Sequence, residues 1–184
     1  MTRVACVFVP RIVRDLATAL ILNALLAGGI GLAPARAAAE DAPQNPAIDT
    51  ALAERGKTLW SGRAGCANCH GWAGDGASKE PFPPGANLRK TSLDKLQIAQ
   101  IVRCGRPGAG MPYFDKSAYA DDRCYGASAQ TLGSLAPQSG VALRANEIDA
   151  IVEYVLARVK GRGKITKAEC EAYFASPAGC ESFD

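Results

Sequence analysis

The stretch Cys66-Ala67-Asn68-Cys69-His70 decides how the rest of this 184-residue sequence is interpreted. Two cysteines separated by two residues and followed directly by a histidine are typical of covalent attachment of a c-type haem. Two thiols at this spacing reach the vinyl groups along one edge of a porphyrin, and the next residue then points its imidazole at the iron. The motif therefore predicts one haem c, bound through Cys66 and Cys69, with His70 as an iron ligand.

Two other kinds of site use a pair of cysteines at this spacing. A zinc site needs further Cys or His residues at short spacing, but the next cysteine is Cys104 and His70 is the only histidine. A thioredoxin-like pair needs a strand-helix-strand setting, and no segment of the sequence alternates apolar and polar residues as a strand does. Because His70 is the only histidine, any Ser-His-Asp triad would have to use it.

Residues 1–37 have the order of a secretory signal peptide. Basic residues precede an apolar run from Leu16 to Ala33, and Ala35-Arg36-Ala37 supplies the small residues of a cleavage site. The apolar run is near the lower length limit for crossing a bilayer, so a retained membrane anchor is the alternative. We expect an exported, periplasmic protein that contacts a membrane only if this leader is retained. Residues 38–47 are expected to form a flexible lead-in.

The net charge of +3 belongs to this leader. Four of the 21 basic residues and one of the 18 acidic residues lie in residues 1–37, so 17 of each remain. A neutral mature chain lacks the electrostatic support for binding nucleic acid. Residues 50–116 nevertheless hold ten basic and five acidic side chains. This excess predicts docking to redox proteins through an acidic face of the partner, although a solvated surface of mixed charge has the same composition.

Four segments show apolar residues at helical spacing, which predicts an all-α fold. The first helix is expected to open at Asn45-Pro46, and Gly56 falls on its apolar stripe. A glycine in a helix indicates either the close approach of another backbone or a tolerated weak position. A short fourth helix is expected to begin at Thr166, whose side chain is suited to cap it.

The two helices between these are longer. The second is expected to begin with the capping box Thr91-Ser92-Leu93-Asp94 and to end at Gly105, with apolar residues around most of its surface, so that it is largely buried. The third is expected from Asn146 to Lys160, and Glu147 and Glu153 lie outside its apolar stripe. That stripe consists of Ile148, Ile151, Val152, Val155 and Val159.

These features together resemble the class I, or monohaem, c-type cytochromes of the exported bacterial type. The likeness covers roughly residues 48–159: a first helix with Gly56 and Trp60, the haem motif, a later Met-Pro pair and a closing amphipathic helix with Tyr154. It implies a cytochrome c fold over residues 48–160, with three main helices around one haem, long loops, and a helical extension over residues 161–184. In such proteins the first and last helices cross, which would explain Gly56.

The resemblance also implies a methionine as the second iron ligand. With His70 already used and Met1 in the leader, Met111 is the candidate, and it lies in the glycine-rich stretch Gly108-Ala109-Gly110-Met111-Pro112. The alternatives are that Met111 is an ordinary core residue and that a lysine or no residue fills the position. The metal ligands are therefore expected to be His70 and Met111.

A further feature of the family is a proline carbonyl that accepts a hydrogen bond from the proximal histidine. Here the stretch Pro84-Gly85-Ala86-Asn87-Leu88 has an alanine directly before the asparagine. Pro83 or Pro84 is the alternative acceptor, and the sequence does not decide between the possibilities.

Four cysteines, Cys104, Cys124, Cys170 and Cys180, remain after haem attachment, and three pairings are possible. We favour a bond between Cys104 and Cys124, because it closes a loop around Met111, and a second bond within the tail. Disulfides form and persist in the oxidising compartments that an export signal implies.

The resulting prediction is a periplasmic single-electron carrier with a His/Met-ligated covalent haem c and no enzymatic activity of its own. One alternative is a permanent haem subunit, or the dedicated electron acceptor, of a periplasmic quinoprotein dehydrogenase. The other is a five-coordinate haem enzyme or gas-binding protein, which would need an iron with an open position.

Overall fold

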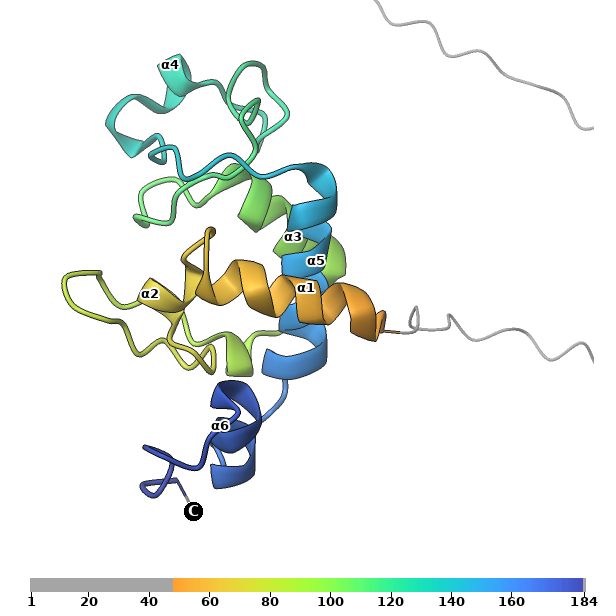
Figure 1. The fold of residues 1–184 in the computed structure, drawn as a ribbon. Coiled ribbons are helices and arrows are strands. Elements are labelled where there is room, and N and C mark those ends of the chain that lie inside the picture. Colours follow the sequence, from red (N-terminus) through yellow and green to blue (C-terminus); the bar gives the residue numbers. More distant parts are fainter. Residues whose placement is uncertain (1–47, 184) are drawn as a thin grey trace, which may run out of the picture. The chain divides into compact units, whose positions relative to one another are not determined.

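The computed structural model describes residues 48–183 (Figure 1). The signal peptide assigned to residues 1–37 and the lead-in at residues 38–47 lie outside the described residues. Between residues 48 and 183 the regular structure is helical, and β-pairing is limited to isolated bridges such as that between Arg106 and Met111. The predicted all-α class is therefore confirmed. None of the helices in this part of the chain has the length and apolar character needed to cross a membrane.

The first helix, α1 (Thr50–Ser61), begins later than predicted. Ile48 and Asp49 precede the helix, and the carboxylate of Asp49 caps it by accepting a hydrogen bond of 2.9 Å from the backbone N–H of Leu52. The expected start at Asn45-Pro46 lies outside the described residues, but the helix that it predicts over Ile48 and Asp49 is not formed. A side-chain acceptor at Asp49 satisfies an N–H of the first turn and so determines where the helix begins.

The last main helix, α5 (Ala145–Tyr154), continues into the π-helical turn η3 (Val155–Val159) and packs against α1 (Figure 1). All five residues of its predicted apolar stripe are buried. Glu147 and Glu153 lie outside that stripe but are buried as well. Each carboxylate has a cationic partner, Arg63 for Glu147 and Lys95 for Glu153. A buried charge is tolerated when it is paired, and the sequence periodicity does not show the pairing.

The second predicted helix is α3 (Lys95–Cys104). Its capping box is formed by Asp94 and Gln97, not by Thr91 and Asp94 as predicted, with hydrogen bonds of 2.8 and 2.9 Å between the two residues. The expectation that this helix is largely buried is also wrong, since Leu96 is 79% exposed. Only one face of α3 packs against α5, and that face carries Ile98, Ala99 and Val102.

The remaining helices are short, and the chain between them includes the predicted long loops, although α4 and η2 are contiguous. They are α2 (Cys66–His70), η1 (Leu88–Lys90), α4 (Ala129–Leu132), η2 (Gly133–Leu135) and α6 (Lys167–Phe174). The hydroxyl of Thr166 caps α6 by accepting a hydrogen bond from the backbone N–H of Glu169, which confirms the predicted start. A disulfide between Cys170 and Cys180 joins α6 to the end of the chain and confirms the favoured tail pairing.

Candidate functional site

The haem motif forms the short helix α2, which follows α1 after a tight turn. Gly65 before it and Gly71 after it have φ values of 66° and 76°, in the left-handed region that glycine adopts most readily. Cys66 and Cys69 are the cysteines of the described residues that are not in disulfides. Burial raises the pKa of the Cys66 thiol to about 12, so this thiol is neutral at pH 7.

The imidazole of His70 is held by one backbone hydrogen bond. Its Nδ1 lies 2.9 Å from the carbonyl oxygen of Ala86. Since a carbonyl can only accept, Nδ1 is the nitrogen that carries the proton in this contact, and Nε2 keeps a free lone pair. Burial lowers the pKa of His70, which favours the neutral form that binds metals. The ring of Trp60 packs beside the imidazole, with 5.9 Å between the ring centroids.

Ala86, and neither Pro83 nor Pro84, therefore supplies the acceptor that the sequence left open. It occupies the position directly before Asn87, and any residue type offers a backbone carbonyl there. Gly85 makes the approach possible, because a Cβ at this position would lie 2.7 Å from Nδ1 of His70. The N–H of Gly85 donates to the carbonyl of Cys69 at 2.7 Å, which fixes the loop beneath the helix.

Met111 lies on a different loop, after α3. The N–H of Arg106 donates to the carbonyl of Met111 at 3.1 Å, so the two ends of this loop lie together. A pocket of about 320 Å³ adjoins the loop and is lined by Leu93, Ile101, Arg106, Pro107 and Tyr125. Within the described residues Met111 and His70 share no hydrogen bond, and the ligation of iron by Met111 stays a prediction.

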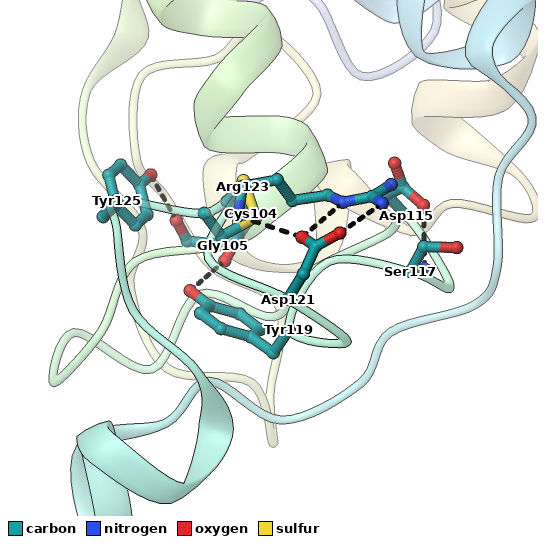
Figure 2. Close-up of a disulfide and its surroundings, with 9 residues drawn as sticks. Cys104, Gly105, Asp115, Ser117, Tyr119, Asp121, Arg123 and Tyr125 are labelled. Atoms are coloured by element: carbon teal, nitrogen blue, oxygen red, sulfur yellow. Dashed lines mark hydrogen bonds and ion pairs between the residues drawn. A yellow bond between two sulfur atoms is a disulfide. The ribbon is translucent and has the colours of Figure 1, made fainter.

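A disulfide fastens the chain just before the Met111 loop (Figure 2). Cys104, the last residue of α3, is bonded to Cys124, which confirms the favoured pairing. Two tyrosines hold the same point: the hydroxyl of Tyr119 donates to the carbonyl of Cys104 at 2.7 Å, and that of Tyr125 to the carbonyl of Gly105 at 2.8 Å. Sequence reasoning missed both tyrosines, although their position on either side of Cys124 was a usable signal.

A second pocket, of about 700 Å³, lies at the start of α5 and is strongly charged. Four basic side chains and two acidic ones line it: Arg63, Arg103, Lys116, Arg144, Asp115 and Glu147. The backbone N–H of Arg144 donates to the carboxylate of Glu147, and Arg63 donates to it at 2.6 Å; these two hydrogen bonds keep the pKa of that carboxyl below its usual range. Three of the ten basic side chains of residues 50–116, those of Arg63, Arg103 and Lys116, therefore lie at one pocket.

The aromatic residues beside the predicted ligands have different roles. Phe114 is a buried core residue, and Tyr113 packs edge-on against Tyr119. Trp72 packs against the aromatic residues of the C-terminal extension, which are Tyr173, Phe174 and Phe183.

A comparison with protein families adds independent information. The family described as cytochrome c oxidase, cbb3-type, subunit III matches residues 51–130, a range that contains all but the first residue of α1, the haem motif, α3 and the Met111 loop. The match supports a c-type cytochrome. No curated protein and no solved structure matched the chain. A c-type cytochrome domain implies covalently bound haem c and electron transfer.

The residues of α2 fit haem c. A c-type cytochrome needs two thiols outside disulfides and one imidazole nitrogen with a free lone pair, and Cys66, Cys69 and Nε2 of His70 supply these. The zinc alternative lacks this support, since no three side chains of the types His, Cys, Asp and Glu gather as a metal site within residues 48–183.

Proposed function

We propose that the protein is an exported single-electron carrier with one haem c, bound through Cys66 and Cys69 and ligated by His70 and Met111. When bound, haem c supplies an iron that takes up and releases one electron. The observation that carries the proposal is the arrangement of α2, where two free cysteines precede an imidazole whose Nδ1 is already bound to the carbonyl of Ala86. A hydrogen bond from Nδ1 to a backbone carbonyl orients the imidazole and makes its other nitrogen a stronger metal ligand.

The Met111 loop supports methionine as the second ligand. The disulfide and the two tyrosine hydroxyls restrain its first end, and the bond between Arg106 and Met111 closes it. Arg106 lines the adjoining pocket, and its positive charge suits a haem propionate. A thioether ligand favours reduced iron over a second nitrogen ligand and suits a carrier.

The charged pocket at the start of α5 supports an acidic redox partner. Lys116 and Arg144 line it together with the paired Arg63 and Arg103. Positive charge gathered at one place raises the rate at which a negatively charged surface meets the protein. The two disulfides support an oxidising compartment such as the periplasm.

Three measurements on the protein purified from a host that matures c-type cytochromes test the proposal. Intact mass is expected to show one covalent haem and the loss of residues 1–37. The variant Cys66→Ala/Cys69→Ala is expected to lose the haem, whereas the matched control Cys170→Ser/Cys180→Ser keeps it. Ferrous wild-type protein is expected to bind carbon monoxide slowly and Met111→Ala to bind it rapidly.

A wild-type protein that binds carbon monoxide as rapidly as Met111→Ala would instead support the five-coordinate alternative. A mass that retains the leader would support a membrane-anchored protein. A wild-type protein without covalent haem would overturn the proposal as a whole.

A further inference from the structure

Arg89 is the centre of a buried polar cluster that the sequence does not mark. Only 4% of the residue is exposed. All three nitrogens of its guanidinium donate hydrogen bonds, to the carbonyls of Ala73, Arg162, Gly163 and Lys164 and to both carboxylate oxygens of Glu169. The two contacts with Glu169 measure 2.7 and 2.8 Å, the forked geometry that arginine forms best with a carboxylate.

These contacts join two regions that are distant in the sequence. One is the loop of residues 71–87 that carries Ala86, which we call the proximal loop. The other is the C-terminal extension, where the connection at residues 162–164 leads directly into α6, which holds Glu169. The backbone repeats the link, since the N–H of Gly161 donates to the carbonyl of Arg89 at 2.9 Å.

The C-terminal extension contacts the proximal loop through side chains as well. Trp72 of the loop packs against Tyr173, Phe174 and Phe183, at 5.1, 5.3 and 5.9 Å between ring centroids. Lys57 of α1 donates to the carbonyl of Tyr173 at 2.8 Å and lies over its ring. The extension is therefore fastened to both α1 and the proximal loop.

The proximal loop in turn positions the acceptor for His70. Ala86 lies between two backbone anchors: the N–H of Gly85 donates to Cys69, and the N–H of Leu88 donates to Gly74, both at 2.7 Å. Arg89 bonds to Ala73, the residue next to the second anchor, at 3.1 Å. A change at Arg89 or Glu169 is thus transmitted over a few residues to the carbonyl that holds Nδ1.

We propose that Arg89 and Glu169 are positioning residues that hold the Ala86 carbonyl on His70, so that the C-terminal extension helps to set the reduction potential. This inference rests on the proposed haem site. A hydrogen bond to Nδ1 makes the imidazole a more basic ligand and so favours ferric iron. Weakening the cluster lengthens this hydrogen bond, and the reduction potential rises.

The test compares Glu169→Gln with Glu171→Gln, which makes the same charge change on the same helix at a residue that is not a partner of Arg89. The potential is measured by redox titration of the full mature protein, and hydrogen–deuterium exchange is measured over residues 71–87. Glu169→Gln is expected to have a higher potential and several-fold faster exchange in this loop than both wild type and Glu171→Gln. Arg89→Lys, which keeps the charge and loses the fork, is a second variant in which both changes are expected in the same direction.

An unchanged potential in folded Glu169→Gln and Arg89→Lys overturns the inference, because the cluster would then only stabilise the fold. Unchanged exchange in residues 71–87 overturns it as well, because the cluster would then not restrain the proximal loop. A wild-type protein without covalent haem refutes the proposed function separately, since the mass measurement detects that failure before any variant is compared.

Discussion

Gly56 of α1 lies directly against the backbone of Ala150 in α5. A Cβ built at position 56 would stand 1.9 Å from the carbonyl oxygen of Ala150 and 2.7 Å from Cβ of Tyr154. The two helices can approach this closely only because position 56 has no side chain. Of the two explanations that the sequence left open for this glycine, the close approach of another backbone is confirmed.

Gly56→Ala is therefore expected to destabilise the protein, although alanine has the higher helix propensity. The added methyl group meets main-chain atoms that cannot rotate away, so the two helices must separate. We expect a loss of about 3 kcal/mol in the free energy of unfolding, at the upper end of the usual cost of overpacking. Urea denaturation measures it. Thr58→Ala, at an exposed position of the same helix, is the control and is expected to change the free energy by less than about 0.5 kcal/mol.

The disulfide between Cys104 and Cys124 is expected to support the second iron ligand. Cys104→Ser/Cys124→Ser removes a cross-link over 20 residues, which by the chain-entropy estimate costs about 3 kcal/mol of stability. It also releases the start of the Met111 loop, so the absorption band of methionine-ligated ferric haem is expected to weaken. Absorption spectra and redox titration measure this change.

Removal of the other disulfide is the control that distinguishes a loss of protein stability from a loss of methionine ligation. Cys170→Ser/Cys180→Ser is expected to lose a similar amount of stability and to keep the absorption band, because this bond lies in the extension. If the Cys104→Ser/Cys124→Ser protein keeps both its band and its potential, the disulfide does not secure the methionine.

Local patterns were sufficient to predict the three main helices, the helix that follows Thr166 and the favoured disulfide pairs, but not the shorter helices between them. The stripe of α5 is buried as expected, because its five apolar residues recur on one face of a helix. The haem motif and the spacing of the four other cysteines are also local signals, and the pairing of neighbours in sequence is what the structure shows.

Features that depend on tertiary partners could not be predicted in this way. Glu153 is buried because Lys95 reaches it from another helix, and Leu96 is exposed because α5 covers only one face of α3. In the sequence nothing distinguishes Arg89 from an arginine at the surface, because its partner Glu169 is 80 residues away. Its role follows only from the contacts of the folded chain.

The charged pocket at the start of α5 predicts a salt-dependent reaction with anions. Lys116→Gln/Arg144→Gln removes two positive charges from its lining. Oxidation of the ferrous protein by the hexacyanoferrate(III) anion is expected to slow several-fold at low ionic strength and to approach the wild-type rate at high salt. Stopped-flow absorbance measures the rate. Lys164→Gln/Lys167→Gln makes the same charge change outside this pocket, and an equal slowing in both variants would show that only net charge matters.

Tyr154 predicts how stability changes at alkaline pH. Burial of its phenol raises the pKa of Tyr154, and the neighbouring Tyr173, Glu169 and Glu54 raise it further, against the opposing effect of Arg158. The folded state therefore keeps the phenol neutral at a pH where the unfolded chain, with a pKa of about 10, has already lost the proton. The stabilising contribution is fully present below about pH 10 and is lost as the pH rises above it.

Tyr154→Phe keeps a ring against Trp60, which lies 5.6 Å away between centroids, and has no group to ionise. The variant is expected to lose less stability than wild type between about pH 9 and 11, since only the wild-type unfolded state gains a phenolate at this position. Urea denaturation at a series of pH values measures the two slopes. Parallel declines would mean that Tyr154 ionises equally in both states, and the buried phenol would then not govern alkaline unfolding.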